Sequence, residues 1–137
     1  MEKTALINAP LSGIIARMGH GDYLVVADSG LPIPYGHQVV DLAVTPHLPR
    51  IQEVLPVILQ ELKVETVIIT KEMEEHSPEY YAELQVQLGK LLPDVPVRKI
   101  PHNRFKEITR ESGNIAFVRT GEATPYANLI LVAGVVF

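Results

Sequence analysis

The chain has 137 residues, a formal net charge of −4 at pH 7 and no cysteine. Its 47% hydrophobic and 20% charged residues are typical of a globular protein, and the length fits a single domain over residues 1–137. An acidic surface repels phosphate backbones, so we expect no nucleic-acid partner. Without cysteine, disulfides, thiolate catalysis and cysteine-ligated metals are excluded.

The two ends of the chain bear on its cellular location and on its oligomeric state. The N-terminal segment lacks the apolar core of a secretory signal, and the longest apolar run, 129–137, is too short to span a bilayer. We therefore expect a cytoplasmic protein without a membrane partner. The chain stays apolar to Phe137, and an apolar end is usually buried, either in the protomer's own sheet or against another subunit. This favours an oligomer.

The first quarter of the chain predicts a helix and a strand. Apolar residues at helical spacing predict the helix over residues 11–18, with Asn8 as its N-cap, Pro10 in its first turn and Gly19 just beyond its end. The continuous apolar run 23–27 predicts a strand that is buried on both faces.

The middle of the chain continues this alternation. A strand is expected over 39–44, and an apolar stripe predicts a helix over 51–62. Pro56 lies inside that helix and predicts a kink or a late start. A β-branched run predicts the next strand over 66–70.

A further helix is predicted to open at Ser77. Its hydroxyl is expected to cap the helix, while Pro78 presets the backbone and Glu79 places negative charge at the positive end of the helix dipole. The predicted apolar stripe of this helix is Tyr81, Leu84, Leu88 and Leu91.

The last third of the chain predicts strands over 95–100, 115–119 and 128–133. A short helix is expected over 103–110, and the loop 120–127 joins the last two strands. Alternating strands and helices, with strands that are apolar on both faces, indicate an α/β domain with a mainly parallel sheet.

In such sheets, ligands bind beyond the carboxyl ends of the strands, and this selects three places in the chain. Asp28 ends the first strand. Its carboxylate either accepts hydrogen bonds from the hydroxyls of a sugar or only stabilises the turn that follows. His102 follows a strand and is either a ligand-binding residue or simply the start of a helix. Tyr126 and Asn128 lie in the segment 121–128, where they either reach a polyol or belong to a plain connection.

The segment Gly19-His20-Gly21-Asp22 follows the first predicted helix. Its two glycines let the backbone turn sharply and present the imidazole with little cover. The carboxyl end of a helix favours a protonated imidazole, and Asp22 is the carboxylate expected to orient the ring. His20 is therefore a candidate general acid or base; the alternative is an exposed histidine in a capping turn.

Other motifs are weaker or missing. A metal site can be drawn from His20, Asp22, Asp28 and His37, but it lacks the ligand spacing of zinc motifs. The sequence has no phosphate-binding glycine loop and no Gly-x-Ser-x-Gly elbow. Three histidines with polar or loop neighbours are expected at the surface: His37, His47 and His76.

Longer strings of residues resemble one family, the RbsD family of D-ribose pyranases. The strings are residues 19–22, 26–34, 101–102, 119–122 and 124–128, and the resemblance continues through the apolar end of the chain. The sister family of L-fucose mutarotases shares the Gly-His-x-Asp start and the Thr-Gly-Glu. It is not expected to share Leu-Pro-Ile-Pro or Pro-Tyr-Ala-Asn, so the ribose branch is favoured.

The resemblance implies an enzyme without a cofactor that interconverts the β-pyranose and β-furanose forms of D-ribose. It implies that His20 is the proton donor and that the sugar is bound by Asp28, His102, Tyr126, Ala127 and Asn128. It also implies a three-layer α/β/α fold with a mainly parallel, mixed sheet. The assembly it implies is a ring-shaped homo-oligomer, a decamer, with sites between neighbouring subunits.

The implied chemistry suits these residues. Changing the ring size requires opening the hemiacetal and closing it on another hydroxyl. If uncatalysed opening takes minutes to hours, its barrier is roughly 20–22 kcal/mol, and a positioned acid–base pair supplies about 10²–10⁴-fold. We expect His20 to protonate the ring oxygen, which requires its ring to be open to a cavity and to face Asp28. The acceptor of the anomeric proton is His102, Asp28 or a water molecule.

Two other functions remain open at this point. One is the same chemistry on another sugar such as L-fucose. The other is a non-catalytic, sugar-binding accessory protein of ribose uptake. For the accessory protein, His20→Ala leaves function intact and Asp28→Ala removes it. For the enzyme, His20→Ala loses turnover but keeps much of the sugar binding.

Overall fold

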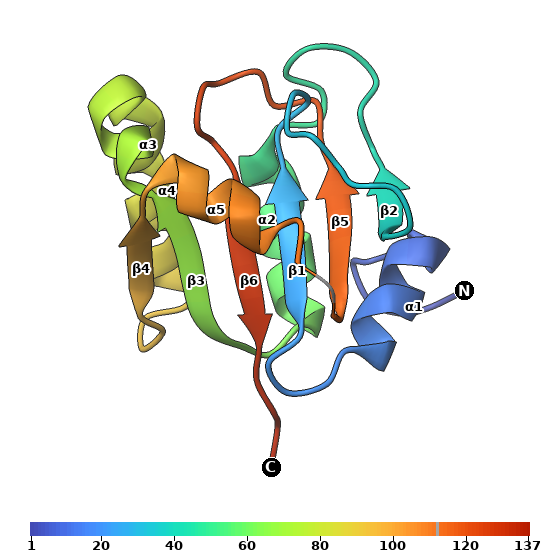
Figure 1. Ribbon diagram of the computed structural model, residues 1–137. Helices are drawn as coiled ribbons and strands as arrows, with labels where there is room; N and C mark the ends of the chain where they lie inside the picture. The colour runs from blue at the N-terminus through green and yellow to red at the C-terminus, as the bar shows by residue number, and fades with distance from the viewer. Residues whose placement is uncertain (112) are drawn as a thin grey trace.

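A computed structural model describes residues 1–111 and 113–137. The described residues form a six-stranded sheet with the order β2-β5-β1-β6-β3-β4 (Figure 1). The strands are β1 Tyr23–Ala27, β2 Gln38–Asp41, β3 Val64–Thr70, β4 Val97–Ile100, β5 Ile115–Arg119 and β6 Leu129–Ala133.

The sheet is mixed, and the direction of one strand decides where the loops lie. β1 and β2 each pair in parallel with β5, and β3 pairs in parallel with β4. β6 is antiparallel to both β1 and β3. The amino end of β6 therefore lies at the same edge as the carboxyl ends of the other strands. We call this the carboxyl edge and the opposite one the amino edge.

Helices cover both faces of the sheet, so the three-layer α/β/α prediction is confirmed. The helices are α1 Ala9–Arg17, α2 Ile51–Glu61, α3 Lys71–His76, α4 Pro78–Leu91 and α5 His102–Ile108. One apolar core lies between the sheet and α1, α2 and α4, and a second lies under α5. In Figure 1, α5 crosses in front of the sheet and α2 lies behind it. None of the helices described over 1–111 and 113–137 is long and apolar enough to cross a membrane.

The apolar run of β1 is explained by these two cores. Leu24 and Val26 pack into the core under α1, α2 and α4, whereas Val25 and Ala27 face the core under α5. Successive side chains of a strand point to opposite faces, so a central strand with helices on both sides is apolar throughout.

The first helix is close to its prediction. The Asn8 side chain accepts a hydrogen bond from the Leu11 N–H (3.0 Å), which confirms the N-cap. The helix ends at Arg17, and Gly19 follows it. The left-handed backbone lies two residues later than expected, at Gly21, with a φ of 83°.

Pro56 does not delay the start of α2, which begins at Ile51. Proline has no N–H to donate to the carbonyl four residues earlier, that of Gln52. That carbonyl instead accepts a hydrogen bond from the side chain of Gln87 on α4, at 2.8 Å. The bond from α4 satisfies the carbonyl that the proline leaves free, so the helix continues through Pro56.

Several local predictions are wrong; among them, Leu91 of the predicted apolar stripe is exposed. The second strand ends earlier than expected, at Asp41. The Ser77 hydroxyl does not cap α4 but donates to the Pro125 carbonyl (2.7 Å), because the last loop packs against it. On α4 the buried tyrosine is Tyr80 rather than Tyr81. Helix α3 was not predicted, since its six residues hold a single buried apolar side chain, Met73, and so show no periodicity.

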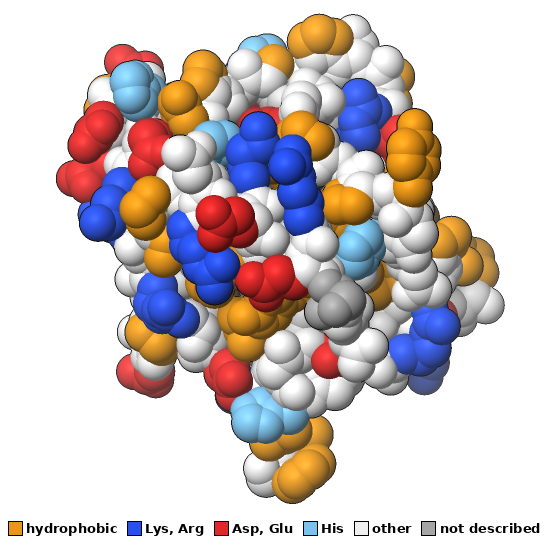
Figure 2. All heavy atoms as spheres, in the orientation of Figure 1, with side chains coloured by type: hydrophobic (Ala, Val, Ile, Leu, Met, Phe, Trp, Pro, Cys, Tyr) orange, Lys and Arg blue, Asp and Glu red, His pale blue; other side chains and the backbone are white. Residues whose placement is uncertain are grey.

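The apolar tail, residues 135–137, is not buried in the protomer's own sheet. β6 ends at Ala133, and the exposed fraction is 89% for Val136 and 101% for Phe137. The tail projects from the amino edge at the bottom of Figure 1, and apolar atoms cover this projection in Figure 2.

Candidate functional site

A cavity of about 420 Å³ opens at the carboxyl edge. Its polar lining comes from three segments that are distant in sequence: the end of β1, the start of α5 and the loop before β6. The polar or ionisable residues that line it are Asp28, His102, Lys106, Tyr126 and Asn128. Cavities of several hundred Å³ that carry a few convergent polar groups are typical of small-molecule sites. We call it the carboxyl-edge cavity.

Asp28 and Asn128 hold each other in this cavity. The Asn128 Oδ1 accepts the backbone N–H of Asp28 (2.7 Å), and the Asn128 Nδ2 donates to Asp28 Oδ2 (3.2 Å). The N–H of Gly30 donates to the other carboxylate oxygen at 2.9 Å. Asn128 is buried and Asp28 is half-buried, so the carboxylate has a fixed orientation at the cavity wall.

The surroundings of Asp28 alter its acidity. Burial raises the pKa of the Asp28 carboxyl above its ordinary value, because loss of solvent disfavours the charged form. The hydrogen bonds to the carboxylate and the nearby His102 act in the opposite direction, but burial is the largest effect. Hydroxyl groups of a bound sugar that donate to this carboxylate would offset its lost solvation.

Tyr126 lies between two histidine rings. Its ring centroid is 5.0 Å from that of His102, at right angles, and 5.1 Å from that of His76. Tyr126 also has a left-handed φ of 59°, a conformation that is uncommon for a non-glycine residue and that clusters at functional sites. The two rings hold the phenol of Tyr126 at the cavity. His76 is exposed, as predicted, but it has this contact as well.

His102 is held from behind. Its backbone N–H donates to Glu72 Oε2 at 2.7 Å, which fixes the start of α5 against α3. Its Nδ1 is covered by protein and has no hydrogen-bond partner in the described part of the chain. Nε2 is therefore the ring nitrogen left to meet a ligand in the cavity.

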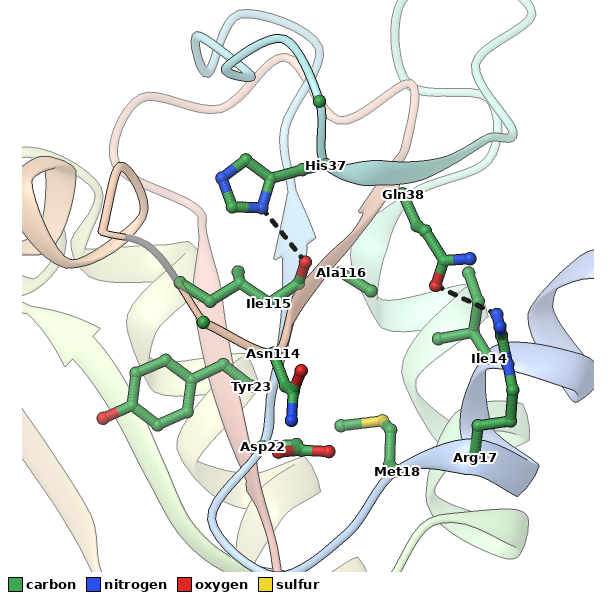
Figure 3. A pocket seen from close by; sticks show the side chains of 12 residues that line it. Ile14, Arg17, Met18, Asp22, Tyr23, His37, Gln38, Asn114, Ile115 and Ala116 are labelled. Atoms are coloured by element: carbon green, nitrogen blue, oxygen red, sulfur yellow. Dashed lines mark hydrogen bonds between the residues drawn. The ribbon is translucent and has the colours of Figure 1, made fainter.

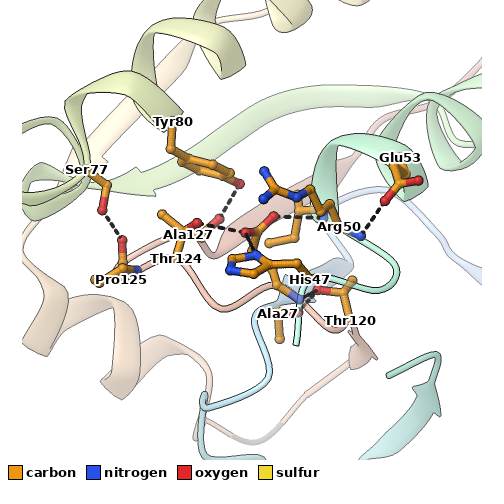
Figure 4. Close-up of polar contacts among 12 residues, drawn as sticks. Ala27, His47, Arg50, Glu53, Ser77, Tyr80, Thr120, Thr124, Pro125 and Ala127 are labelled. Atoms are coloured by element: carbon orange, nitrogen blue, oxygen red, sulfur yellow. Dashed lines mark hydrogen bonds and ion pairs between the residues drawn. The ribbon is translucent and has the colours of Figure 1, made fainter. Parts of the chain in front are cut away.

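Ala127 lies behind the cavity. It is fully buried, its methyl group packs in the core under α2 and α4, and its carbonyl accepts a hydrogen bond from the Tyr80 hydroxyl (2.9 Å). Figure 4 shows this bond together with the one from Ser77 to the Pro125 carbonyl. Two hydrogen bonds from α4 and its cap thus fix the loop that carries Tyr126 and Asn128.

A buried carboxylate, Glu122, anchors the other end of the same loop. Its side chain accepts hydrogen bonds from the Ile51 N–H (3.2 Å) and the Thr124 hydroxyl (2.8 Å), and His47 Nδ1 lies 3.4 Å away. Figure 4 labels His47 and Thr124, two of the residues that lie against this carboxylate. Glu122 has no exposed surface, so its role is to join the loop to the start of α2.

Lys106 lines the cavity although it was not predicted as a site residue. It lies four residues after His102 on α5, and residues at this spacing share one face of a helix. That spacing is the signal from which the lysine could have been found.

His20 lies at the amino edge, apart from this cavity. Its Nε2 is 2.7 Å from Glu65 Oε2 of β3. The prediction that Asp22 orients the ring is wrong, because the Asp22 carboxylate accepts the backbone N–H of Gly19 (2.8 Å) and so serves the turn itself. The ring is open to a separate cavity of about 460 Å³, which the apolar tail 135–137 also lines.

The six predicted site residues therefore divide into groups. Four of them line the carboxyl-edge cavity: Asp28, His102, Tyr126 and Asn128. Ala127 is packed behind it, and His20 lies at the other edge. The five residues of β1 separate His20 from Asp28, about 17 Å along the strand. Within one chain, His20 and Asp28 cannot contact the same pentose.

A further cavity, of about 300 Å³, lies between α1, β2 and the amino ends of β1 and β5. Figure 3 shows Arg17 donating to Gln38 and His37 Nδ1 directed at the Ile115 carbonyl along its wall. None of the predicted site residues lines it.

Known proteins resemble this chain over its whole length. The D-ribose pyranase of Coprothermobacter proteolyticus is 53% identical over 137 residues, the whole of both chains. The structure of Bacillus subtilis RbsD complexed with D-ribose superposes with a TM-score of 0.88 at 39% identity, again over all of both chains.

A more distant structure shares the fold. The fucose mutarotase of Streptococcus pneumoniae, in complex with L-fucose, gives a TM-score of 0.78 at 23% identity and covers 96% of this chain and all of its own. The model of the RbsD / FucU transport protein family matches residues 1–136. We conclude from the fold and from these full-length similarities that the chain belongs to the RbsD / FucU transport protein family.

Proposed function

We propose that this protein is an isomerase that interconverts the β-pyranose and β-furanose forms of D-ribose. The observation that carries the proposal is the carboxyl-edge cavity. There a half-buried carboxylate, held by a buried amide, faces a space of about 420 Å³ beside a tyrosine, a histidine and a lysine. The full-length relatives of the chain include D-ribose pyranases at 42–53% identity.

The residues of the carboxyl-edge cavity bind the sugar. Asp28 accepts hydroxyl hydrogen bonds, the Asn128 amide holds Asp28, and Tyr126 and His102 supply a hydroxyl and a ring nitrogen. Ala127 has its methyl group in the core and its carbonyl bonded to Tyr80, so it reaches the sugar through its backbone N–H.

The ring opens by general acid–base catalysis. His20 gives a proton to the ring oxygen as the bond from that oxygen to C1 breaks, and the C1 hydroxyl releases its proton to His102, Asp28 or water. Closure on the other hydroxyl reverses these transfers, so no atom or electron is gained or lost. The reacting sugar is neutral, and a positioned acid and base meet the requirements of the reaction.

The site is completed between two subunits. His20 and the sugar cavity lie at opposite edges of one chain, so the His20 of one subunit serves the Asp28 cavity of its neighbour. The apolar tail beside His20 supports this, because exposed apolar side chains are typical of surfaces that another subunit covers. Contact between two different edges is heterologous, and such contacts form a ring when the rotation between subunits closes. The proposed assembly is a homodecamer in the cytoplasm.

Saturation-transfer NMR on D-ribose tests the activity. The protein should speed exchange between pyranose and furanose signals, and a panel with L-fucose should show a clear preference for ribose. His20→Ala should lose exchange and keep much of the ribose binding, whereas Asp28→Ala should lose both. Folded protein that leaves ribose exchange unchanged would reject the enzyme, and ribose binding alone would favour an accessory protein.

Mixed oligomers test the shared site. His20→Ala and Asp28→Ala chains, each inactive alone, are co-expressed and purified together. If the two residues come from neighbouring subunits, random mixing restores both at about one quarter of the interfaces and a corresponding share of the activity. A site built within one chain predicts no recovery.

A further inference from the structure

The turn that carries His20 is fixed to the sheet. The Gly21 N–H donates to the Ala133 carbonyl (2.8 Å), and the Ala133 N–H donates to the Asp22 carbonyl (2.8 Å). The Asp22 carboxylate accepts a hydrogen bond from the Gly19 N–H at 2.8 Å. The backbone under His20 is thus tied to the end of β6, so only rotation of its own side chain is left to set the direction of the ring.

An irregularity in β3 brings a carboxylate to that ring. Val64 pairs with Ala133 and Thr66 pairs with Val132, so Glu65 is an extra residue in the pairing with β6. Such bulges redirect side chains and are frequent next to active sites. The carboxylate of Glu65 lies 2.7 Å from His20 Nε2, a short distance typical of hydrogen bonds to charged groups.

The neighbour of this carboxylate leaves room for it. A Cβ atom added at Gly134 would lie 3.3 Å from the Cβ of Glu65 and 3.4 Å from the Cγ of Lys63. The contact with Glu65 is closer than ordinary van der Waals distance, and the contact with Lys63 lies at its lower limit. A side chain at position 134 would therefore press on the base of Glu65, and the absence of one leaves Glu65 free to reach His20.

We infer that Glu65 is the positioning residue of His20 and that Nδ1 is the ring nitrogen that exchanges its proton with the sugar. The inference rests on the proposed function for the identity of the sugar. A carboxylate only accepts hydrogen bonds, so the nitrogen that faces Glu65 carries a hydrogen. Nε2 therefore keeps its proton throughout, and Nδ1 gives one to the ring oxygen and regains one when the ring closes. This is the arrangement in which a carboxylate sets the tautomer of a catalytic histidine.

Glu65 differs from the other charged residues near the ring because it alone among those described makes a hydrogen bond to the imidazole. Glu61 and Lys63 line the same cavity, but no hydrogen bond among the described residues joins either to the imidazole. Asp22 is engaged by the turn. Glu61→Gln thus removes one carboxylate charge from the cavity that His20 lines without removing a contact of His20, and it is the matched control.

The tautomer of His20 gives a test that needs no sugar. Nitrogen-15 NMR of the intact oligomer, labelled at histidine and assigned by the signals lost in His20→Ala, should show neutral His20 protonated at Nε2. Glu65→Ala should shift it toward a mixture of tautomers, and Glu61→Gln should leave it unchanged. A wild-type ring protonated at Nδ1, or a tautomer of His20 that does not change in Glu65→Ala, would overturn the inference.

Ribose exchange gives the second test. Because Glu65 does not line the sugar cavity, Glu65→Ala should lower kcat with KM within about twofold. The loss should be roughly 10- to 100-fold, below the ~10⁴-fold effect of losing the buried orienting carboxylate of a serine protease. Glu65→Gln retains an acceptor oxygen and should fall between Glu65→Ala and the wild type. Size-exclusion chromatography checks that each variant keeps its assembly.

The two sets of results separate the inference from the proposed function. An equal loss in Glu61→Gln, or an unchanged kcat in Glu65→Ala, contradicts the role of Glu65. If instead the wild type fails to exchange ribose, or His20→Ala is as fast as the wild type, the proposed function is wrong. The histidine spectra then still decide whether Glu65 orients the ring.

Discussion

Asp28 and Asn128 lie one hundred residues apart in the chain and hold each other through two hydrogen bonds, one to the backbone and one to the carboxylate. One residue ends β1 and the other precedes β6, so the antiparallel pairing of these two strands brings them together. Asn128 thereby orients the group that we expect to bind the sugar.

Replacing Asn128 should weaken both stability and binding. Asn128→Ala leaves the partly buried N–H of Asp28 without an acceptor, so the free energy of unfolding should fall by about 1–3 kcal/mol. The KM for ribose should rise, because the carboxylate loses its orientation. Urea unfolding and NMR exchange measure the two effects. Asn103→Ala, at an exposed position of α5, should change stability by less than about 0.5 kcal/mol.

The acidity of Asp28 predicts how ribose binding depends on pH. Burial raises the pKa of Asp28, so a larger fraction is protonated at a given acidic pH than for a free aspartate. A protonated carboxyl has lost part of its capacity to accept hydroxyl hydrogen bonds. KM should therefore rise as the pH falls toward this raised pKa, and the rise should begin at a higher pH than for an aspartate with an ordinary pKa. In Asp28→Asn this dependence should be absent; a variant that keeps it would assign the titration to another group.

Removing the buried carboxylate of Glu122 should loosen the loop that carries the site. Glu122→Ala leaves the Ile51 N–H and the Thr124 hydroxyl without their partner and should lower the free energy of unfolding by about 2–4 kcal/mol. Denaturant unfolding measures the loss. Glu75→Ala, on the exposed side of α3, should cost less than about 0.5 kcal/mol. Equal losses in both variants would contradict the anchoring role.

Tyr80 should make the protein less stable at alkaline pH. Burial, followed by the charges of Glu122 and Asp28, raises the pKa of Tyr80 well above 10.0. Above pH 10 the unfolded chain releases this proton while the folded protein keeps it, so the folded state binds more protons. Its stabilising contribution is thus complete below pH 10 and is lost as the pH rises toward the raised pKa.

Tyr80→Phe isolates that effect. At neutral pH the variant should lose about 1 kcal/mol, because the hydrogen bond to the Ala127 carbonyl is gone. At alkaline pH its stability should decline less steeply than that of the wild type, since phenylalanine has no proton to release. Thermal unfolding followed from neutral to alkaline pH compares the two slopes, and parallel slopes would contradict the assignment.

Local patterns in the sequence predicted most of the fold. They also predicted the part of the proposed site that lies at the carboxyl edge. The apolar run of β1, the Asn8 cap of α1 and the β-branched residues of β3 depend on neighbours within a few positions, and these elements form where predicted. The carboxyl-edge rule selected Asp28 and His102 because a parallel sheet places all such strand ends together.

The sequence alone therefore determined the α/β class, the presence of the six strands and four of the polar residues that line the carboxyl-edge cavity. Only the tertiary structure decided that Asn128 holds Asp28, that Glu65 rather than Asp22 contacts His20, and that His20 lies at the far edge from Asp28. The first two relationships join residues that are 100 and 45 positions apart. They depend on strand order, on the reversed direction of β6 and on one extra residue in β3, which local propensity does not encode.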